Sequence, residues 1–254
     1  MRSLLATLSA WLALGAGPLC AAELHIATAA NFAAPLQKLT PLFERATGHT
    51  LALSTGSSGQ LYARIRQAAP FDVFLSADTE KPQLLEQQGL TVPGSRFVYA
   101  IGTLLLWSPR TDLVDGGGAV LGQGRYRLLA IANPETAPYG TAARQVLMKL
   151  GLWDALYRDH KIVLGENITQ AWQFAASGNA DLAFVALSQV LGPDGAIAGS
   201  SWRVPQSMYD RIEQAAVIIA ASPQQQAAHA FVNWLRSDPA ALAAIRAAGY
   251  DTAD

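Results

Sequence analysis

Short apolar runs of strand-forming residues alternate with helical patterns along the chain, and this alternation constrains the fold more than any other feature. Parallel strands need long crossover connections, which helices supply, so the alternation predicts βα units around mainly parallel sheets. The expected strands are residues 24–27, 50–54, 71–75, 128–132, 161–164, 181–187 and 215–220, with a longer apolar stretch at 97–107. The predicted class is therefore α/β.

Local signals mark several helix boundaries. Pro41 lies inside the first helical pattern and predicts a kink or a restart there. Ser222 followed by Pro223 predicts a capped helix that begins at the proline, and Asp238 predicts the start of the last helix in the same way. Residues 192–207, rich in Gly, Pro and Ser, are expected to be irregular.

The N-terminus has the pattern of a secretory signal peptide. A positive charge precedes an apolar run at residues 4–16, and small residues lead to a cleavage site after Ala22. The run is shorter than the roughly 18 to 20 residues that span a bilayer, which disfavours a membrane anchor. Lipid attachment at Cys20 is also disfavoured, because Leu19 stands where a small residue is needed. We therefore expect residues 1–22 to be removed on export.

Composition and charge exclude several classes of protein. The chain is 51% hydrophobic and 15% charged, unlike disordered proteins, and its net charge of −1 gives no basic excess for nucleic acid. The one cysteine lies in the signal peptide, so the mature chain has neither disulfides nor thiolate metal sites. No metal site and no cofactor are expected, because metal-ligand spacing is missing among His25, His49, His160 and His229.

Small polar or aromatic residues recur where an expected strand meets the next helix. The first N–H groups of a helix have no partner within it and carry a partial positive charge. Several such ends that converge on one point bind an anion without Lys or Arg, whereas a single one is better explained by helix capping. Four together favour an anion site, and they are Ala30-Asn31, Ser57-Ser58, Tyr139-Gly140 and Asn167-Ile168.

Two catalytic interpretations are weaker. The Gly-Ser-Ser-Gly turn at residues 56–59 suggests an exported serine hydrolase that uses Ser57 or Ser58, but the Gly-x-Ser-x-Gly pattern is not met. Asp72 and Asp78 are interpreted as a structural residue and a helix cap rather than as a carboxylate pair. No enzymatic activity is therefore expected.

Four segments resemble, in the same order, the periplasmic molybdate-binding proteins of bacterial ABC importers. They are Ala-Ala-Asn-Phe at 29–32, Gly-Ser-Ser-Gly-Gln-Leu-Tyr at 56–62, Ala-Pro-Phe-Asp-Val-Phe-Leu-Ser-Ala-Asp at 69–78, and Asn-Pro with Ala-Pro-Tyr-Gly at 133–140. The resemblance covers essentially the whole mature chain. It implies a type II periplasmic binding protein, in which two lobes with mixed, mainly parallel sheets close a cleft around molybdate or tungstate.

The resemblance also implies the anion-binding residues. These are Asn31 and Ser58, each through its side chain and backbone N–H, then Tyr139 and Ile168 through backbone N–H, with Ala30 as a further contact. Molybdenum is bound only as the oxyanion. The chain departs from several relatives at Ala186, where they have a tyrosine that hydrogen-bonds the anion. We hypothesise that the Tyr139 hydroxyl supplies the missing donor.

Lobes of this kind are discontinuous in sequence. We expect lobe 1 at residues 23–103 plus 218–254 and lobe 2 at 104–217, with hinge segments near 100–106 and 214–218. The implied partner is a membrane ABC permease, and the protein is expected to be a periplasmic monomer. A receptor for sulfate or phosphate on the same scaffold is the main alternative.

Overall fold

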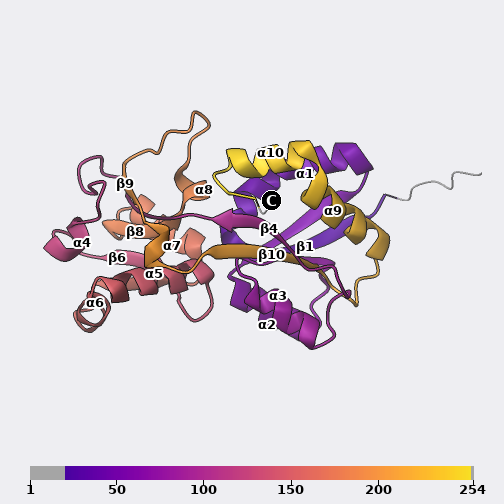
Figure 1. Cartoon of the computed structure of the whole chain (residues 1–254), viewed down its shortest axis with the longest axis horizontal. Helices are drawn as coiled ribbons and strands as arrows, with labels where there is room; N and C mark the ends of the chain where they lie inside the picture. Colours follow the sequence, from indigo (N-terminus) through magenta and orange to yellow (C-terminus); the bar gives the residue numbers. More distant parts are fainter. Residues whose placement is uncertain (1–20, 253–254) are drawn as a thin grey trace, which may run out of the picture.

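Two mixed sheets with helices around them form two lobes that lie side by side (Figure 1). The computed structural model describes residues 21–252, so residues 1–20, with Cys20 and most of the expected signal peptide, lie outside the described residues. The α/β class is confirmed. No helix in residues 21–252 is long and apolar enough to cross a membrane.

The first lobe is built on the sheet β2-β1-β3-β10-β4. Its strands are β1 (Glu23–Ala29), β2 (Thr50–Gly56), β3 (Val73–Leu75), β4 (Phe97–Gly102) and β10 (Ile212–Ile218). One face packs against α1 (Ala33–Thr47), α9 (Gln225–Ser237) and α10 (Pro239–Ala247). The other face is covered by α2 (Ser58–Arg66) and α3 (Glu80–Gln87) (Figure 1).

The second lobe is built on the sheet β7-β6-β8-β5-β9. Its strands are β5 (Leu104–Ser108), β6 (Leu129–Ala132), β7 (Ile162–Gly165), β8 (Leu182–Ala186) and β9 (Ser200–Arg203). The helices around it are α4 (Val120–Gln123), α5 (Pro138–Lys149), α6 (Trp153–Arg158), α7 (Ile168–Ala176) and α8 (Leu187–Val190). The short 3-10 helices η1 (Ala30–Phe32) and η2 (Gln206–Met208) complete the described elements.

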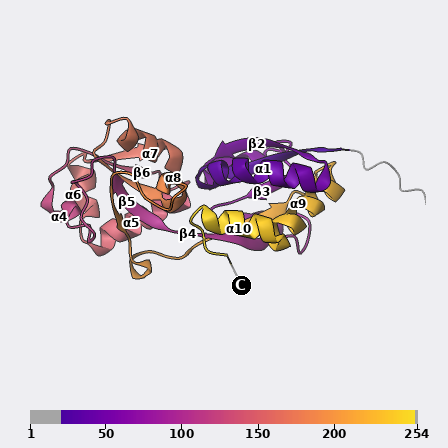
Figure 2. The same cartoon turned by 90° about the horizontal axis from the view of Figure 1, so that it is seen from above.

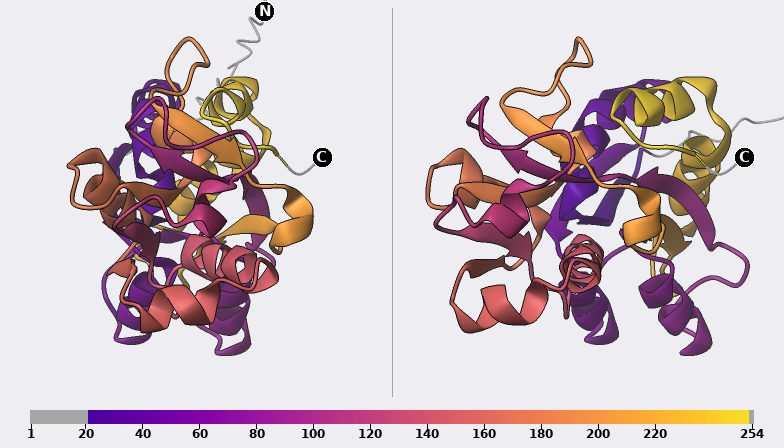
Figure 3. Two further views of the ribbon diagram at one scale, coloured as in Figure 1. Left: turned by 90° about the vertical axis from the view of Figure 1, so that its left-hand side faces the viewer. Right: turned by 60° about the vertical axis from the view of Figure 1, so that its left-hand side comes forward.

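Within the described residues the chain crosses between the sheets twice, at Thr103 and at residues 204–211. Only β5 and β10 run against the other strands of their sheets, and each is the first strand after a crossing. The crossings lie side by side, because the Leu104 N–H donates to the Tyr209 hydroxyl at 3.2 Å and the Val204 N–H donates to the Leu104 carbonyl at 3.2 Å. Figure 2 and Figure 3 show the lobes joined by these extended segments.

Two local expectations are wrong, and the one at Pro41 is corrected in part. The α1 helix continues through Pro41, so there is no restart, and buried Leu36, Leu39 and Phe43 hold both sides of the proline against the core. The region expected to be irregular contains β9, which pairs with β5. The α9 helix begins at Gln225, two residues after the expected proline.

Ser222 explains the late start of α9. Its hydroxyl donates to buried Asp72 and accepts from the Gln224 N–H at 3.0 Å, so this serine organises the turn before the helix. Asp72 also accepts from the His25 N–H at 2.7 Å, which agrees with its structural interpretation.

The start of β10 also lies earlier than expected, at Ile212, because polar residues and a bulge at Gln214 hide the strand pattern. The lobe limits stay a prediction.

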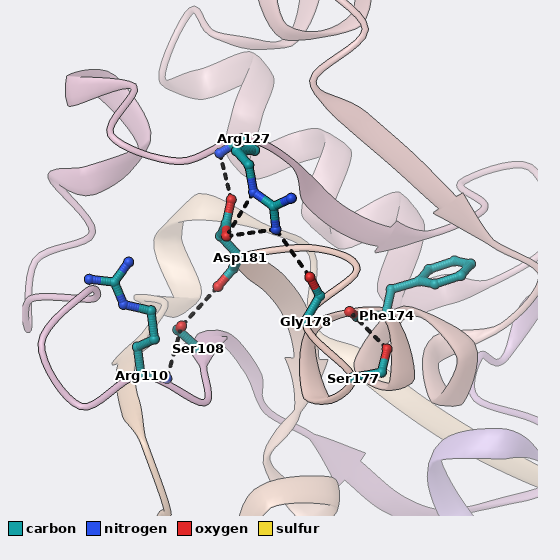
Figure 4. A network of polar contacts seen from close by, with 7 residues as sticks. All are labelled: Ser108, Arg110, Arg127, Phe174, Ser177, Gly178 and Asp181. Carbon is teal, nitrogen blue, oxygen red and sulfur yellow. Dashed lines mark hydrogen bonds and ion pairs between the residues drawn. The ribbon is translucent and has the colours of Figure 1, made fainter.

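An ion pair at Asp181 fixes the end of the second lobe far from the crossings (Figure 4). Its carboxylate accepts from the Arg127 backbone N–H at 2.6 Å and from the guanidinium at 3.2 Å. The same guanidinium donates to the Gly178 carbonyl, and the Asp181 carbonyl accepts from Ser108 at 2.8 Å. Burial acts to raise the pKa of Asp181, but the bonds from Arg127 outweigh it and hold that pKa below the ordinary value.

Asp181→Asn is expected to lower the free energy of unfolding by about 1 kcal/mol at neutral pH, because it removes the charge while the arginine is mostly exposed. A lowered folded-state pKa stabilises above the unfolded-state pKa, and this gain is lost as the pH falls through the folded-state value. Urea unfolding of both proteins between neutral and acidic pH measures the difference. A difference that stays constant as the carboxylate titrates would contradict the assignment.

Candidate functional site

A small cavity lies between the lobes at the point where the four expected junctions meet. Its free volume is about 10 Å³, room for about one water molecule, so the two lobes pack closely around it. No charged residue is among the described residues that line it. The first lobe contributes Ala29, Ala30, Asn31, Gly56, Ser57 and Ala77, and the second contributes Ala137, Pro138, Tyr139, Asn167 and Ile168.

Helix N-termini from both lobes meet at this cavity. Ile168, the first residue of α7, lines it, whereas Ser58, the first residue of α2, follows the lining residue Ser57 and is not itself part of the lining. Pro138 opens α5 but has no N–H, so the Tyr139 N–H is the first donor of that helix. The first N–H groups of these helices have no acceptor within them, and the helix dipoles add partial positive charge. The cavity is therefore suited to an anion.

The capping residues are neighbours of the expected anion-binding residues. Ser57 accepts from the Gln60 N–H at 3.3 Å, and the Gln60 side chain accepts from the Ser57 N–H at 3.2 Å. Asn167 accepts from the N–H groups of Thr169 and Gln170 at 3.0 and 3.1 Å. Capping thus accounts for Ser57 and Asn167, and it leaves the first N–H group of each helix without an acceptor.

The Ser58 hydroxyl has a different role from a cap. Its oxygen accepts from the Ala77 N–H at 2.9 Å, and the residue is 1% exposed. With the oxygen held in this way, the hydroxyl proton is available to a ligand. No His, Asp or Glu side chain bonds Ser57 or Ser58 in the described part of the chain, so the arrangement that activates a serine nucleophile does not form there.

Asn31 is placed at the cavity, but its side chain is engaged elsewhere. The Nδ2 group donates to Gln214 Oε1 at 2.8 Å and to the Tyr250 hydroxyl at 3.0 Å, which uses both of its protons. The Asn31 carbonyl accepts from Tyr250 at 2.8 Å and from Ser188 at 3.1 Å. The backbone N–H is the donor that Asn31 has left for a ligand, in contrast to the expected side-chain contact.

The Tyr139 hydroxyl faces β4 and β10, the strands of the first lobe that adjoin the crossings. It accepts from Gln214 Nε2 at 3.4 Å, and a Cβ added to Gly102 would overlap it, so glycine is required there. Burial first, and then the nearby Tyr250 and Tyr99 hydroxyls, raise the pKa of Tyr139 well above its ordinary value, so the phenol stays neutral. Ala186 ends β8 and is absent from the cavity lining, while its N–H donates to a glutamine side chain at 3.0 Å.

A wider open cleft of about 500 Å³ adjoins the cavity and shares Ala77, Ala137 and Pro138 with it. Its charged lining is Asp78, Glu80, Glu135, Asp210 and Glu213 against Lys81 and Arg211. An excess of carboxylates repels anions, so the small neutral cavity is the better anion site. Burial raises the pKa of Asp78, although its Oδ1 accepts from the Lys81 N–H at 2.8 Å at the start of α3.

The sequence analysis did not find four polar groups that surround the site. Gln214, Tyr250, Tyr99 and Ser188 connect Asn31 with both lobes, and the Thr169 hydroxyl donates to the Ala30 carbonyl at 3.3 Å. No motif marks them, because their partners are distant in the chain. Among residues 21–252 no group of three His, Cys, Asp or Glu side chains is placed to hold a metal ion.

Residues 24–251 match the family of bacterial extracellular solute-binding proteins. The chain is 49% identical over 242 residues to the molybdate-binding protein ModA of Azotobacter vinelandii, which covers 94% of this chain and 95% of that protein. It is 47% identical over 235 residues to the molybdate-binding protein ModA of Rhodobacter capsulatus, which covers 92% and 90% respectively.

Solved structures agree with these sequence matches. The Azotobacter vinelandii periplasmic molybdate-binding protein superposes with a TM-score of 0.89 at 45% identity, over 91% of this chain and all of that chain. The sulfate-binding protein SubI of Mycobacterium tuberculosis has a TM-score of 0.72 at 14% identity, over 92% of this chain and 88% of that chain. The second likeness concerns the fold alone, and both agree with a two-lobed type II binding protein.

Proposed function

Because the chain belongs to the bacterial extracellular solute-binding proteins, and within them to the family of periplasmic molybdate-binding proteins, we propose that its interlobe cavity captures molybdate or tungstate. The observation that carries the proposal is the convergence of three helix N-termini from two lobes on a small cavity without charged lining. A compact dianion satisfies several such ends at once.

The proposed donors are the backbone N–H groups of Asn31, Ser58, Tyr139 and Ile168 together with the Ser58 hydroxyl, and Ala30 is a further contact. Donors from the first lobe and from the second lobe share one ligand, so binding favours the closed arrangement of the lobes. The closed protein then presents the anion to an ABC permease. Export as a cleaved, monomeric periplasmic protein completes the proposal, and no catalytic step is assigned.

Molybdate is expected to raise the melting temperature by several degrees. A ligand that binds only the folded protein adds about 2.7 kcal/mol at a hundredfold excess over Kd. Sulfate and phosphate at the same concentration are expected to do little, because fixed neutral donors select an anion by its size and its full deprotonation. Calorimetric titrations with molybdate, tungstate, sulfate and phosphate measure this order, and equal affinities would refute it.

Ser58→Ala is expected to weaken molybdate binding by about 1.5 to 3 kcal/mol, roughly 10- to 150-fold, because it deletes a donor to a charged ligand. Ser57→Ala is the matched control, since it removes the cap of the same helix. We expect Ser57→Ala to cost about 1 kcal/mol of stability and little affinity. Titration and thermal unfolding of both variants separate the roles, and equal affinity losses would contradict them.

Tyr139→Phe tests whether the hydroxyl replaces the donor missing at Ala186. The hydroxyl bonds Gln214 at a long distance of 3.4 Å, so we expect the variant to bind molybdate within about threefold of the parent. A loss of tenfold or more with an unchanged melting temperature would instead support the compensation hypothesis. Tyr126→Phe, which changes a buried tyrosine inside the second lobe, is the control for general effects of the substitution.

A further inference from the structure

The C-terminal turn, residues 249–251, contacts the anion site, a crossing segment and the opposite lobe. Tyr250 is completely surrounded by protein, and its hydroxyl donates to the Asn31 carbonyl at 2.8 Å and accepts from the Asn31 side chain at 3.0 Å. Two bonds therefore hold residue Asn31, one through its side chain and one through the carbonyl on the far side of its Cα from the backbone N–H, and so help to fix the direction of that N–H. Both partners belong to the first lobe, so these bonds do not depend on closure.

The same turn is fixed to the first crossing. Asp251 and Ile101 exchange both backbone hydrogen bonds, with the Ile101 N–H donating at 2.7 Å and the Asp251 N–H at 3.1 Å. Ile101 lies in β4, two residues before the chain enters the second lobe at Thr103. The turn is therefore bonded directly to the strand that leads into the first crossing.

The second lobe reaches the turn through α8. The Ser188 hydroxyl lies 2.8 Å from the Tyr250 hydroxyl and 3.1 Å from the Asn31 carbonyl. Gly249 has a φ of +87°, and a Cβ there would lie 2.9 Å from Leu187 Cγ, so only glycine allows this approach. Figure 2 shows the end of α10 next to α8 across the lobe boundary.

We propose that Tyr250 is a positioning residue for the anion site and that the turn of residues 249–251 receives α8 as a latch when the lobes close. The proposal rests on the proposed function of the cavity. Tyr250 holds the side chain and carbonyl of Asn31 at all times, whereas Ser188 and Leu187 reach the turn only in the closed arrangement. The Ser188 bonds break when the lobes open, so their loss affects the rate of ligand release. The Tyr250 bonds persist, so their loss affects the geometry of the site.

The two roles give different kinetic results. Ser188→Ala is expected to raise the rate constant of molybdate release about tenfold. Its association rate constant is expected to stay within about twofold of the parent value. The melting temperature of the anion-free variant is expected to stay within about one degree of that of the parent. Tyr250→Phe is expected to raise Kd about tenfold or more, because the side chain and the carbonyl of Asn31 each lose a bond that helps to hold its N–H in position.

Release of radioactive molybdate after dilution into unlabelled molybdate measures these rates in the full mature chain. The controls are Ser177→Ala, whose hydroxyl bonds only residues within four positions of it in the chain, and Tyr126→Phe. Release from Ser188→Ala within twofold of Ser177→Ala overturns the latch, even where Tyr250→Phe folds poorly. A parent protein that fails to bind molybdate overturns the proposed function and this inference with it, whereas a binding parent with unaffected variants overturns this inference alone.

Discussion

The requirement that buried backbone N–H groups find an acceptor shapes this protein around its central cavity. Three helices from two lobes begin at the same small space, and in two of them the caps Ser57 and Asn167 accept from N–H groups of the second or third helical residue. The remaining first N–H groups need an acceptor that the chain itself does not supply there. Mainly parallel sheets make this possible, because their helices start at the same edge of each sheet.

The two crossings determine how such a site opens and closes. Leu104 is bonded to Val204 and Tyr209 of the second crossing, so we expect the two crossing segments to move together. Away from the crossings, the lobes meet through a small number of polar contacts between described residues. In one of them the Gly59 N–H donates to the Thr136 carbonyl at 2.9 Å. A ligand that contributes several hydrogen bonds across this boundary shifts the balance between open and closed arrangements by its difference in affinity for the two.

Sequence reasoning succeeded where the physics is local. Asp238 accepts from the Ala240 and Ala241 N–H groups, as its place before a proline predicts. It failed where partners are distant: Asn31 and Tyr250 are 219 positions apart, and no pattern announced that the Asn31 amide would be used by Gln214 and Tyr250. The start of β10 was missed because Gln214 is polar, yet it is completely buried by its tyrosine and asparagine partners.

Neutral donors explain why a cavity without Lys or Arg gives selectivity. A charged Lys or Arg side chain attracts any oxyanion, while N–H groups fixed by capped helices donate only to oxygens at set positions. The Asn31 and Ala30 carbonyls on the first lobe receive bonds from Tyr250, Ser188 and Thr169, which hold this part of the lining in place. In a lining of fixed N–H donors, a protonated oxyanion such as hydrogen phosphate sets an O–H against a donor where a dianion has a bare oxygen, so one hydrogen bond is lost. The capped helices that fix the donors thus also contribute to the exclusion of the wrong ligand.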